Sequence, residues 1–182
     1  MPELQSPNQM SIDEILESLE VFDGKYKRAE VDAAIGNREE MVPRLIEVLE
    51  GVLANPEKIA EDETYIGHVY ALMLLGHFRE PQAHRTIIAV SSLGGDLPYR
   101  LFGDSITEDL AIILLRTCNG SIEAIKGLVQ DKGADDYCRG GRVPKRSRMA
   151  SLKEPCRERK PCLFWVGCLW RVRPRSLVYS MT

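Results

Sequence analysis

The sequence predicts an all-α protein, built as a short HEAT- or armadillo-like α-solenoid of antiparallel helix pairs. Two strongly apolar helical runs, at residues 65–78 and 106–118, are each followed by a tight break and a shorter helix. The leucine pairs Leu74-Leu75 and Leu114-Leu115 stand at equivalent places in the two runs, forty positions apart. A two-helix unit that recurs at about 40 residues is typical of HEAT-like arrays. Residues 1–137 contain no alternating β pattern of useful length.

Three helices are expected before the first long apolar run. Ser11 and Glu14 have the spacing of a capping box, in which each side chain satisfies the other residue's backbone N–H, so a helix is expected to start there. A short helix is expected at 28–35 and a full helix at 38–54. Because Pro43 lacks an N–H and is tolerated only near a helix start, the regular part of the third helix is expected from Val42 onward.

The run at residues 65–78 is apolar around most of its circumference, which indicates a helix buried on more than one side. Shorter helices are expected at 82–93 and 122–129, a long one at 106–118, and a single turn at 98–102. The residues expected in the core are Val69, Leu72, Met73, Leu75, Ile87, Ile88, Ile113, Leu114 and Leu128.

The net charge of -3 is the sum of two unlike parts. Residues 1–137 hold 12 Lys+Arg against 25 Asp+Glu, a net charge of -13, whereas residues 138–182 hold 12 against 2, a net of +10. The second part also contains four of the five cysteines and both tryptophans. We therefore expect a disordered N-terminus at 1–10, a helical-repeat domain at 11–137 and a basic tail at 138–182.

Composition restricts the location and the partners. No apolar run approaches the roughly 20 residues needed to span a bilayer, and the first residues lack a basic-then-apolar leader, so no membrane span and a cytoplasmic location are expected. The acidic balance of residues 1–137 argues against nucleic-acid binding by the folded part, because phosphate backbones attract cationic surfaces.

No constellation of residues forms a recognisable active site. Nucleophile motifs, phosphate-binding glycine loops and paired-cysteine motifs are absent. His68 and His77 are nine residues apart and face roughly opposite sides of their helix, so a metal site that joins them is not expected. Together with His84, they are interpreted as structural. The sequence therefore predicts no enzyme activity and no cofactor.

Acidic residues gather at the starts of two equivalent helices, and they suggest an alternative function. These residues are Asp62, Glu63, Asp104, Glu108 and Asp109. Stacked repeats would bring the two helix starts to one edge, where the carboxylates could form the site of an enzyme or of a metal- or small-ligand-binding domain. Ordinary capping is the favoured interpretation, because every one of them occupies a capping position.

The favoured function is a non-catalytic protein-interaction module, because helical arrays bind peptides or protein surfaces along an extended groove. A protein or peptide partner is expected. The residues that could form the interaction surface are His68, Tyr70, Arg79, Glu80, Asp104, Glu108 and Asp109.

The run at residues 65–81, YIGHVYALMLLGHFREP, resembles a bacterial family known only as a domain of unknown function. The resemblance covers roughly residues 11–140 and also includes the segments at 11–27, 103–109 and 114–121. It implies a HEAT-like helical-repeat fold, and many members of the family end in a SEC-C motif, which is a small zinc-binding segment. It implies no activity, because none is established for the family.

The resemblance is expected to end at Cys138-Arg139-Gly140, where the composition changes. The tail is rich in arginine and proline, it carries an apolar block at 162–170, and its cysteines at 156, 162 and 168 lack the close pairs of structural zinc sites. We therefore expect a truncated or frameshifted chain whose tail is disordered or out of frame. Its last helix pair, at 106–129, would then lack the neighbour that covers it.

Overall fold

The structure, a computed structural model, describes residues 10–140. Within that range all regular secondary structure is helical, apart from two isolated antiparallel β-bridges, Val21 with Tyr65 and Gly94 with Ala134. The predicted all-α class is therefore confirmed for these residues. The expectations for residues 1–9 and 141–182 lie outside the described residues.

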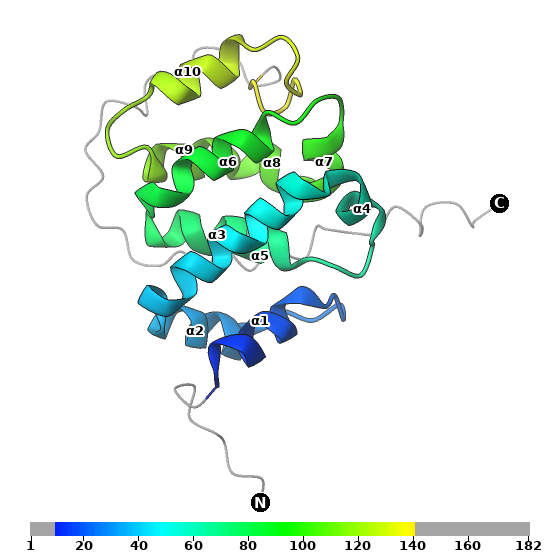
Figure 1. Ribbon diagram of the computed structural model, residues 1–182, viewed down its shortest axis with the longest axis vertical. Coiled ribbons are helices and arrows are strands. Elements are labelled where there is room, and N and C mark those ends of the chain that lie inside the picture. The colour runs from blue at the N-terminus through cyan, green and yellow to red at the C-terminus, as the bar shows by residue number, and fades with distance from the viewer. Residues whose placement is uncertain (1–9, 141–182) are drawn as a thin grey trace, which may run out of the picture.

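The helices follow one another in the order shown in Figure 1. Their bounds are α1 Ile12–Glu20, α2 Arg28–Gly36, α3 Arg38–Ala54, α4 Pro56–Glu61, α5 Gly67–Phe78, the 3₁₀-helix η2 Pro81–Ala83, α6 His84–Ser91, α7 Leu97–Phe102, α8 Ser105–Glu108, α9 Leu110–Thr117 and α10 Glu123–Gln130.

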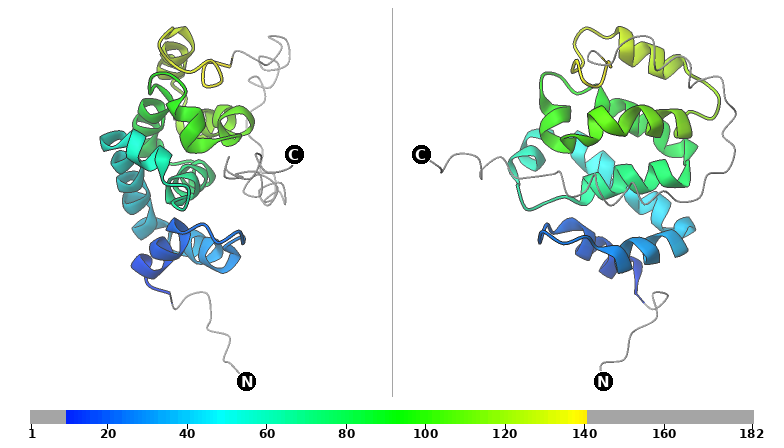
Figure 2. Two further views of the ribbon diagram at one scale, coloured as in Figure 1. Left: turned by 90° about the vertical axis from the view of Figure 1, so that its right-hand side faces the viewer. Right: turned by 180° about the vertical axis from the view of Figure 1, so that it is seen from behind.

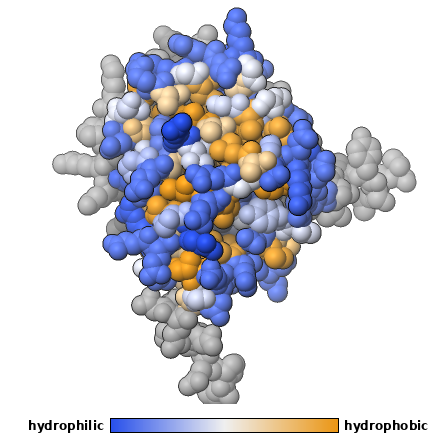
Figure 3. All heavy atoms as spheres, in the orientation of Figure 1, coloured by the Kyte–Doolittle hydropathy of each residue, from blue (hydrophilic) through white to orange (hydrophobic). Residues whose placement is uncertain are grey.

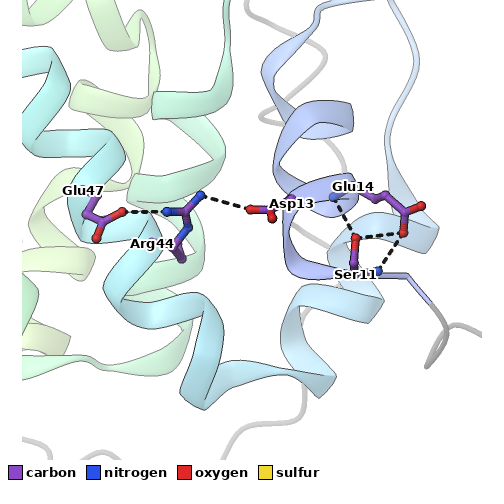
Figure 4. Close-up of polar contacts among 5 residues, drawn as sticks. All are labelled: Ser11, Asp13, Glu14, Arg44 and Glu47. Carbon is purple, nitrogen blue, oxygen red and sulfur yellow. Dashed lines mark hydrogen bonds and ion pairs between the residues drawn. The ribbon is translucent and has the colours of Figure 1, made fainter.

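The predicted capping box is present at the start of α1. The backbone N–H of Glu14 donates to Ser11 Oγ at 3.3 Å, and the backbone N–H of Ser11 donates to Glu14 Oε2 at 2.8 Å (Figure 4). On the same side, Arg44 of α3 forms ion pairs with Asp13 of α1 and with Glu47, both at 3.1 Å. The side chains are exposed, so this link orients α1 against α3 and contributes little stability.

Pro43 was expected to delay the regular part of α3 to Val42, but it does not. The helix begins at Arg38, and Pro43 lies inside it. The backbone N–H of Met41 already donates to Asn37 O at 3.0 Å, so the first turn is formed ahead of the proline. Only the bond that residue 43 would make to the carbonyl of Glu39 is lost, which a 17-residue helix tolerates so close to its start.

Two further boundaries differ from expectation because one residue ends one helix and begins the next. The run at 106–118 is divided into α8 and α9 at Asp109, whose N–H donates back to Ser105 O while its own carbonyl accepts from Ile112 and Ile113. Asn55-Pro56 ends α3 as expected, but Pro56 also takes the first position of the unpredicted α4.

The helices lie in two layers. One layer contains α1, α3, α6 and α10, and the other contains α2, α5 and α9, as Figure 1 and the left-hand view of Figure 2 show. Within the layers, α3 packs against α6, α6 against α10, and α5 against α9. Between the layers, α1 packs against α2, α3 against α5, and α6 against α9. The chain thus runs from α1 at one end of the molecule to α10 at the other.

This packing corrects the expected pairing of each long helix with the shorter helix that follows it. The central helix α5 packs mainly against α3 and α9, not against α6. The helix that pairs with α5 across the two layers is therefore α3, the long helix that precedes it in the chain. The core prediction itself is confirmed for eight of its nine residues, all of which are buried, whereas Ile88 is half-buried.

Glycine is required where α5 and α9 meet. A Cβ atom built on Gly76 would lie 2.7 Å from Cγ1 and 3.1 Å from Cγ2 of Ile113 on α9. Real Cβ atoms essentially never approach so closely, and the β-branched side chain of Ile113 has little rotamer freedom in a helix with which to move away.

Replacing Gly76 by alanine should therefore destabilise the protein by about 1–3 kcal/mol through overpacking, less the roughly 1 kcal/mol that alanine gains in helix propensity. Gly51→Ala and Gly127→Ala are the matched controls, because both glycines are helical and nothing lies within 4 Å of an added Cβ. Denaturant unfolding should show both controls at least as stable as the wild type. Equal stability of Gly76→Ala and the controls would mean that α5 and α9 do not meet here.

Candidate interaction surface

Three of the residues expected on an interaction surface are buried instead. His68, Tyr70 and Glu80 are 3%, 2% and 7% exposed, respectively. Their positions follow from α5, which is buried over almost its whole circumference because it lies between α3 and α9. These three side chains are therefore not part of the exposed surface in this structure, and their role in partner binding stays a prediction.

His68 joins α5 to α7 through its imidazole ring. Its Nε2 lies 2.7 Å from the backbone carbonyl oxygen of Leu101, and because a carbonyl only accepts, Nε2 carries the proton and donates. The ring stacks on Tyr65 at 5.5 Å between centroids and meets the ring of Phe102 edge-on at 5.2 Å. Burial lowers the pKa of His68 to about 4, so the side chain is neutral near pH 7. These contacts support a structural role.

Tyr70 and Glu80 also serve the fold. Burial raises the pKa of the Tyr70 hydroxyl above its ordinary value. A carboxylate oxygen of Glu80 accepts from the backbone N–H of Gln82 at 3.3 Å and so caps η2. Its other oxygen lies 3.3 Å from Nη2 of Arg38 at the start of α3, an ion pair that offsets the burial of the carboxylate.

The acidic residues of the alternative hypothesis remain near the surface. Glu108, Asp62 and Glu63 are exposed, and Asp104 and Asp109 are half-buried. Asp62 forms a turn in which its carboxylate accepts from the backbone N–H and the hydroxyl of Thr64. Within residues 10–140, no group of three or more histidine, cysteine, aspartate or glutamate side chains is placed to hold a metal ion. The acidic helix starts are therefore not brought together as a metal site in the described part of the chain.

The other two histidines lie nearer the surface, close to the ends of α5 and α9. His84 Nδ1 is 2.9 Å from the hydroxyl oxygen of Thr117, at the end of α9. Partial burial lowers the pKa of His84, and burial also lowers the pKa of His77, with nearby Arg116, Arg79 and Arg38 adding to that effect.

Exposed apolar side chains gather on the last two long helices of the described chain. Ile112 is 51% and Leu115 40% exposed on α9, while Ile122 is 42% and Val129 48% exposed at the ends of α10. We use the name terminal apolar face for these four residues, which lie on the last two helices of the described chain but in different layers. An uncovered last helix pair was expected from the sequence, in which Leu115 lies in an apolar run, but the outward-facing residues of that run were not predicted.

The side of the molecule that Figure 3 draws also carries apolar residues. On the side of the molecule formed by α3 and α6, hydrophobic patches are separated by hydrophilic residues (Figure 3). Helix α9 lies on the opposite side, in front of the right-hand view of Figure 2. Elsewhere in the described residues only Val21 and Ile35 are large hydrophobic residues of comparable exposure, and they lie at α1 and α2.

In the described part of the chain, no helix has both the length and the apolar content needed to cross a bilayer. The fold defines a class of protein: an all-α domain with a buried central helix and exposed apolar side chains on the last two helices of the described residues. Residues 10–152 match the family described as "Protein of unknown function (DUF1186)", and the chain belongs to that family.

Two relatives are uncharacterised chlamydial proteins. They come from Chlamydia muridarum (strain MoPn / Nigg) and Chlamydia trachomatis serovar D (strain ATCC VR-885 / DSM 19411 / UW-3/Cx), and each is 28% identical to this chain over 191 residues. Each match covers 95% of this chain and 76% of the relative. No solved structure shows a significant match.

These matches correct one expectation about the tail. The similarity was expected to end at Gly140, yet the family match continues to residue 152. Residues 1–140 are 140 of 182 residues, or 77% of the chain, whereas the chlamydial matches cover 95% of it. Similarity to relatives therefore extends into the basic tail. The hypothesis of an out-of-frame tail stays a prediction, which reading the gene in its other two frames after codon 140 would test.

Proposed function

We propose that this protein is a non-catalytic protein-interaction module, a short HEAT-like helical array that binds a partner protein at its α9–α10 end. The observation that carries this proposal is the terminal apolar face. A HEAT-like array is supported by the two layers, in which α3, α6 and α10 follow one another on one side and α5 and α9 on the other. Its proposed location is the cytoplasm.

The geometry of α9 indicates what the partner must offer. Leu110, Ile113 and Leu114 turn inward and are buried. Ile112 and Leu115 are three residues apart, so they lie one turn above each other on the outer side of the same helix. In a stacked array the next helix would lie on this side. A partner helix with its own apolar stripe would therefore fit the face, in the manner of helix-in-groove recognition.

The size of the face sets a limit on the affinity. Full burial of a leucine or isoleucine side chain contributes about 1.5–3 kcal/mol, so four half-exposed residues would contribute on the order of 4 kcal/mol. Association itself costs at least about as much. The apolar face alone would therefore support only weak binding, and a specific partner needs additional contacts.

Affinity capture from cells that carry the gene natively would test the proposal. The full chain should retain one or more proteins that the double variant Ile112→Ser/Leu115→Ser loses, because the variant keeps the buried inward residues of α9 and changes only two half-exposed side chains. Val21→Ser/Ile35→Ser is the matched control, since it also removes two exposed aliphatic side chains, but at α1 and α2. The control should retain the same proteins as the wild type.

Two results would contradict the proposal. Capture that is equal for the α9 variant and the control would show that the terminal apolar face does not bind. Saturable turnover of a substrate by the purified chain, lost on replacement of His68 or Asp109, would show an enzyme instead.

A further inference from the structure

Three arginines lie near His77 where α5 and α9 end, since the pKa of His77 is lowered by burial and, in addition, by the charges of Arg116, Arg79 and Arg38. Gly76 of α5 lies against Ile113 of α9, so the last turns of the two helices are neighbours. His77 and Arg79 follow Gly76 directly, and Arg116 lies one helical turn beyond Ile113.

Arg38 reaches the same place from the start of α3. Its guanidinium carbon lies 5.7 Å from the centre of the Phe78 ring. The centre of the His77 ring lies 5.8 Å from the centre of the same Phe78 ring. We call Arg38, His77, Arg79 and Arg116 the arginine cluster. It comes from three separate helices.

The cluster carries positive charge that the described residues do not neutralise. Arg38 pairs with the buried carboxylate of Glu80 at 3.3 Å, but neither Arg79 nor Arg116 forms an ion pair within residues 10–140. The lack of an ion pair does not by itself mark a site, because five other basic residues of the described part also lack one: Lys25, Lys58, Arg85, Arg100 and Lys132. Arg79 and Arg116 are thus two cations without an ion pair at neighbouring helix ends, in a part of the chain where 24 acidic residues outnumber 13 basic ones.

The backbone at Arg79 is a second unusual feature. Arg79 has φ 54° and ψ 46°, the left-handed conformation that ends a helix in a Schellman-type turn, and the N–H of Glu80 closes the turn on Leu75 O at 3.2 Å. Glycine is the residue most often found there, because any Cβ costs about 1–2 kcal/mol. An arginine at this position is less stable than glycine would be, which favours a use for its side chain.

Basic residues at helix ends also have a simpler explanation. Arg116 and His77 lie in the last turns of their helices, where a cation is favoured by the helix dipole. The helix dipole does not explain why an arginine takes the left-handed backbone position at residue 79. It also does not explain why arginines from three helices lie near one another. Arg38 lies at the start of α3, where the dipole disfavours a cation.

We propose that the arginine cluster binds an oxyanion group, a carboxylate or a phosphate, held by Arg79 and Arg116 with Arg38 beside them. Guanidinium groups offer paired N–H donors that match both kinds of oxyanion. Arg116 follows the exposed Leu115 directly in α9, so an oxyanion here would lie at the edge of the terminal apolar face. The site does not depend on that face and can exist without a protein partner there.

The test measures the Tm of the full chain with two probes, inorganic phosphate and a short peptide of glutamates with blocked ends. Each probe is compared with chloride at the same ionic strength. A ligand that binds only the folded state raises Tm by mass action. The wild type should gain Tm with at least one probe, and the ring pKa of His77, followed by NMR, should rise on binding. Arg79→Gly/Arg116→Gln should bind at least about tenfold more weakly, because both charge-assisted contacts are lost.

Two features keep the result interpretable. Arg79→Gly suits the left-handed backbone, so the variant should fold. Arg100→Gln is the control, since Arg100 is exposed, has no ion pair among the described residues and belongs to α7, which contacts the opposite end of α5. Binding of phosphate alone or of the peptide alone identifies the source of the oxyanion. No binding of either probe, or equal binding by the double variant and the wild type, would overturn the proposal.

Discussion

Leu72→Ala is expected to lower the free energy of unfolding by about 2–5 kcal/mol. Leu72 is 1% exposed in the middle of α5, the helix that packs against α3, α9 and α1. Truncation removes buried methyl groups and leaves a cavity that three neighbouring helices cannot all close. Since domains of this size are stable by only about 5–15 kcal/mol, the loss should be visible as a large shift of the denaturant midpoint.

Leu115→Ala is the matched control for this experiment. The chemistry of the substitution is identical, but Leu115 is 40% exposed on α9, so a much smaller loss is expected. A loss below about 0.5 kcal/mol for Leu72→Ala, or losses of equal size for the two variants, would mean that α5 is not the centre of the core.

Acid should destabilise the protein through His68. The pKa of His68 is about 4 in the folded protein and 6.5 ordinarily, so the charged form is disfavoured by folding. Above pH 6.5 the residue is neutral in both states and contributes no pH dependence. Between pH 6.5 and about 4 the unfolded chain takes up the proton and the folded chain does not, so stability falls as the pH falls. Below about pH 4 both states are protonated and the loss is complete.

The expected loss is about 3 kcal/mol over that whole window and about 2 kcal/mol between pH 7 and pH 5. Other groups also titrate there, so the quantity to measure is the difference in pH dependence between the wild type and His68→Gln. His77→Gln is the control, because His77 is only half-buried. If His68→Gln loses as much stability as the wild type between pH 7 and pH 5, His68 is not the buried neutral group described above.

Short sequence motifs predicted helix boundaries best where a residue belongs to the start or the end of one helix, and not to both. The Ser11–Glu14 capping box is visible in four residues of sequence and is present in the structure. Asp109 was predicted to lie in the first turn of one helix, but it ends α8 and begins α9. A helix was predicted to end at residue 54, but the short helix α4 that Pro56 begins was not predicted, although proline suits a first helical position. Sequence alone does not decide between such roles, because the tertiary packing selects one of them.

Side-chain exposure was harder to predict than helix position. An apolar pattern around the whole of α5 predicted burial but gave no reason to exclude the polar His68 and Tyr70 from the surface. The arginine cluster was missed except for Arg79. The sequence does contain a pattern that could have indicated it, because Arg38, Arg79 and Arg116 are 41 and 37 residues apart, close to the expected repeat of about 40 residues. Residues at one repeat spacing come to the same end of an array.

Site-directed photo-crosslinking tests most directly whether the α9–α10 end of the protein binds another protein. A photo-reactive amino acid in place of Leu115 would lie on the terminal apolar face, and the same residue in place of Val21 would lie at the end of α1 with similar exposure. If the terminal apolar face binds another protein, position 115 should form a discrete adduct with it in cells that carry the gene natively. Position 21 should not form this adduct. No adduct at position 115, or the same adducts at both positions, would contradict the proposed binding.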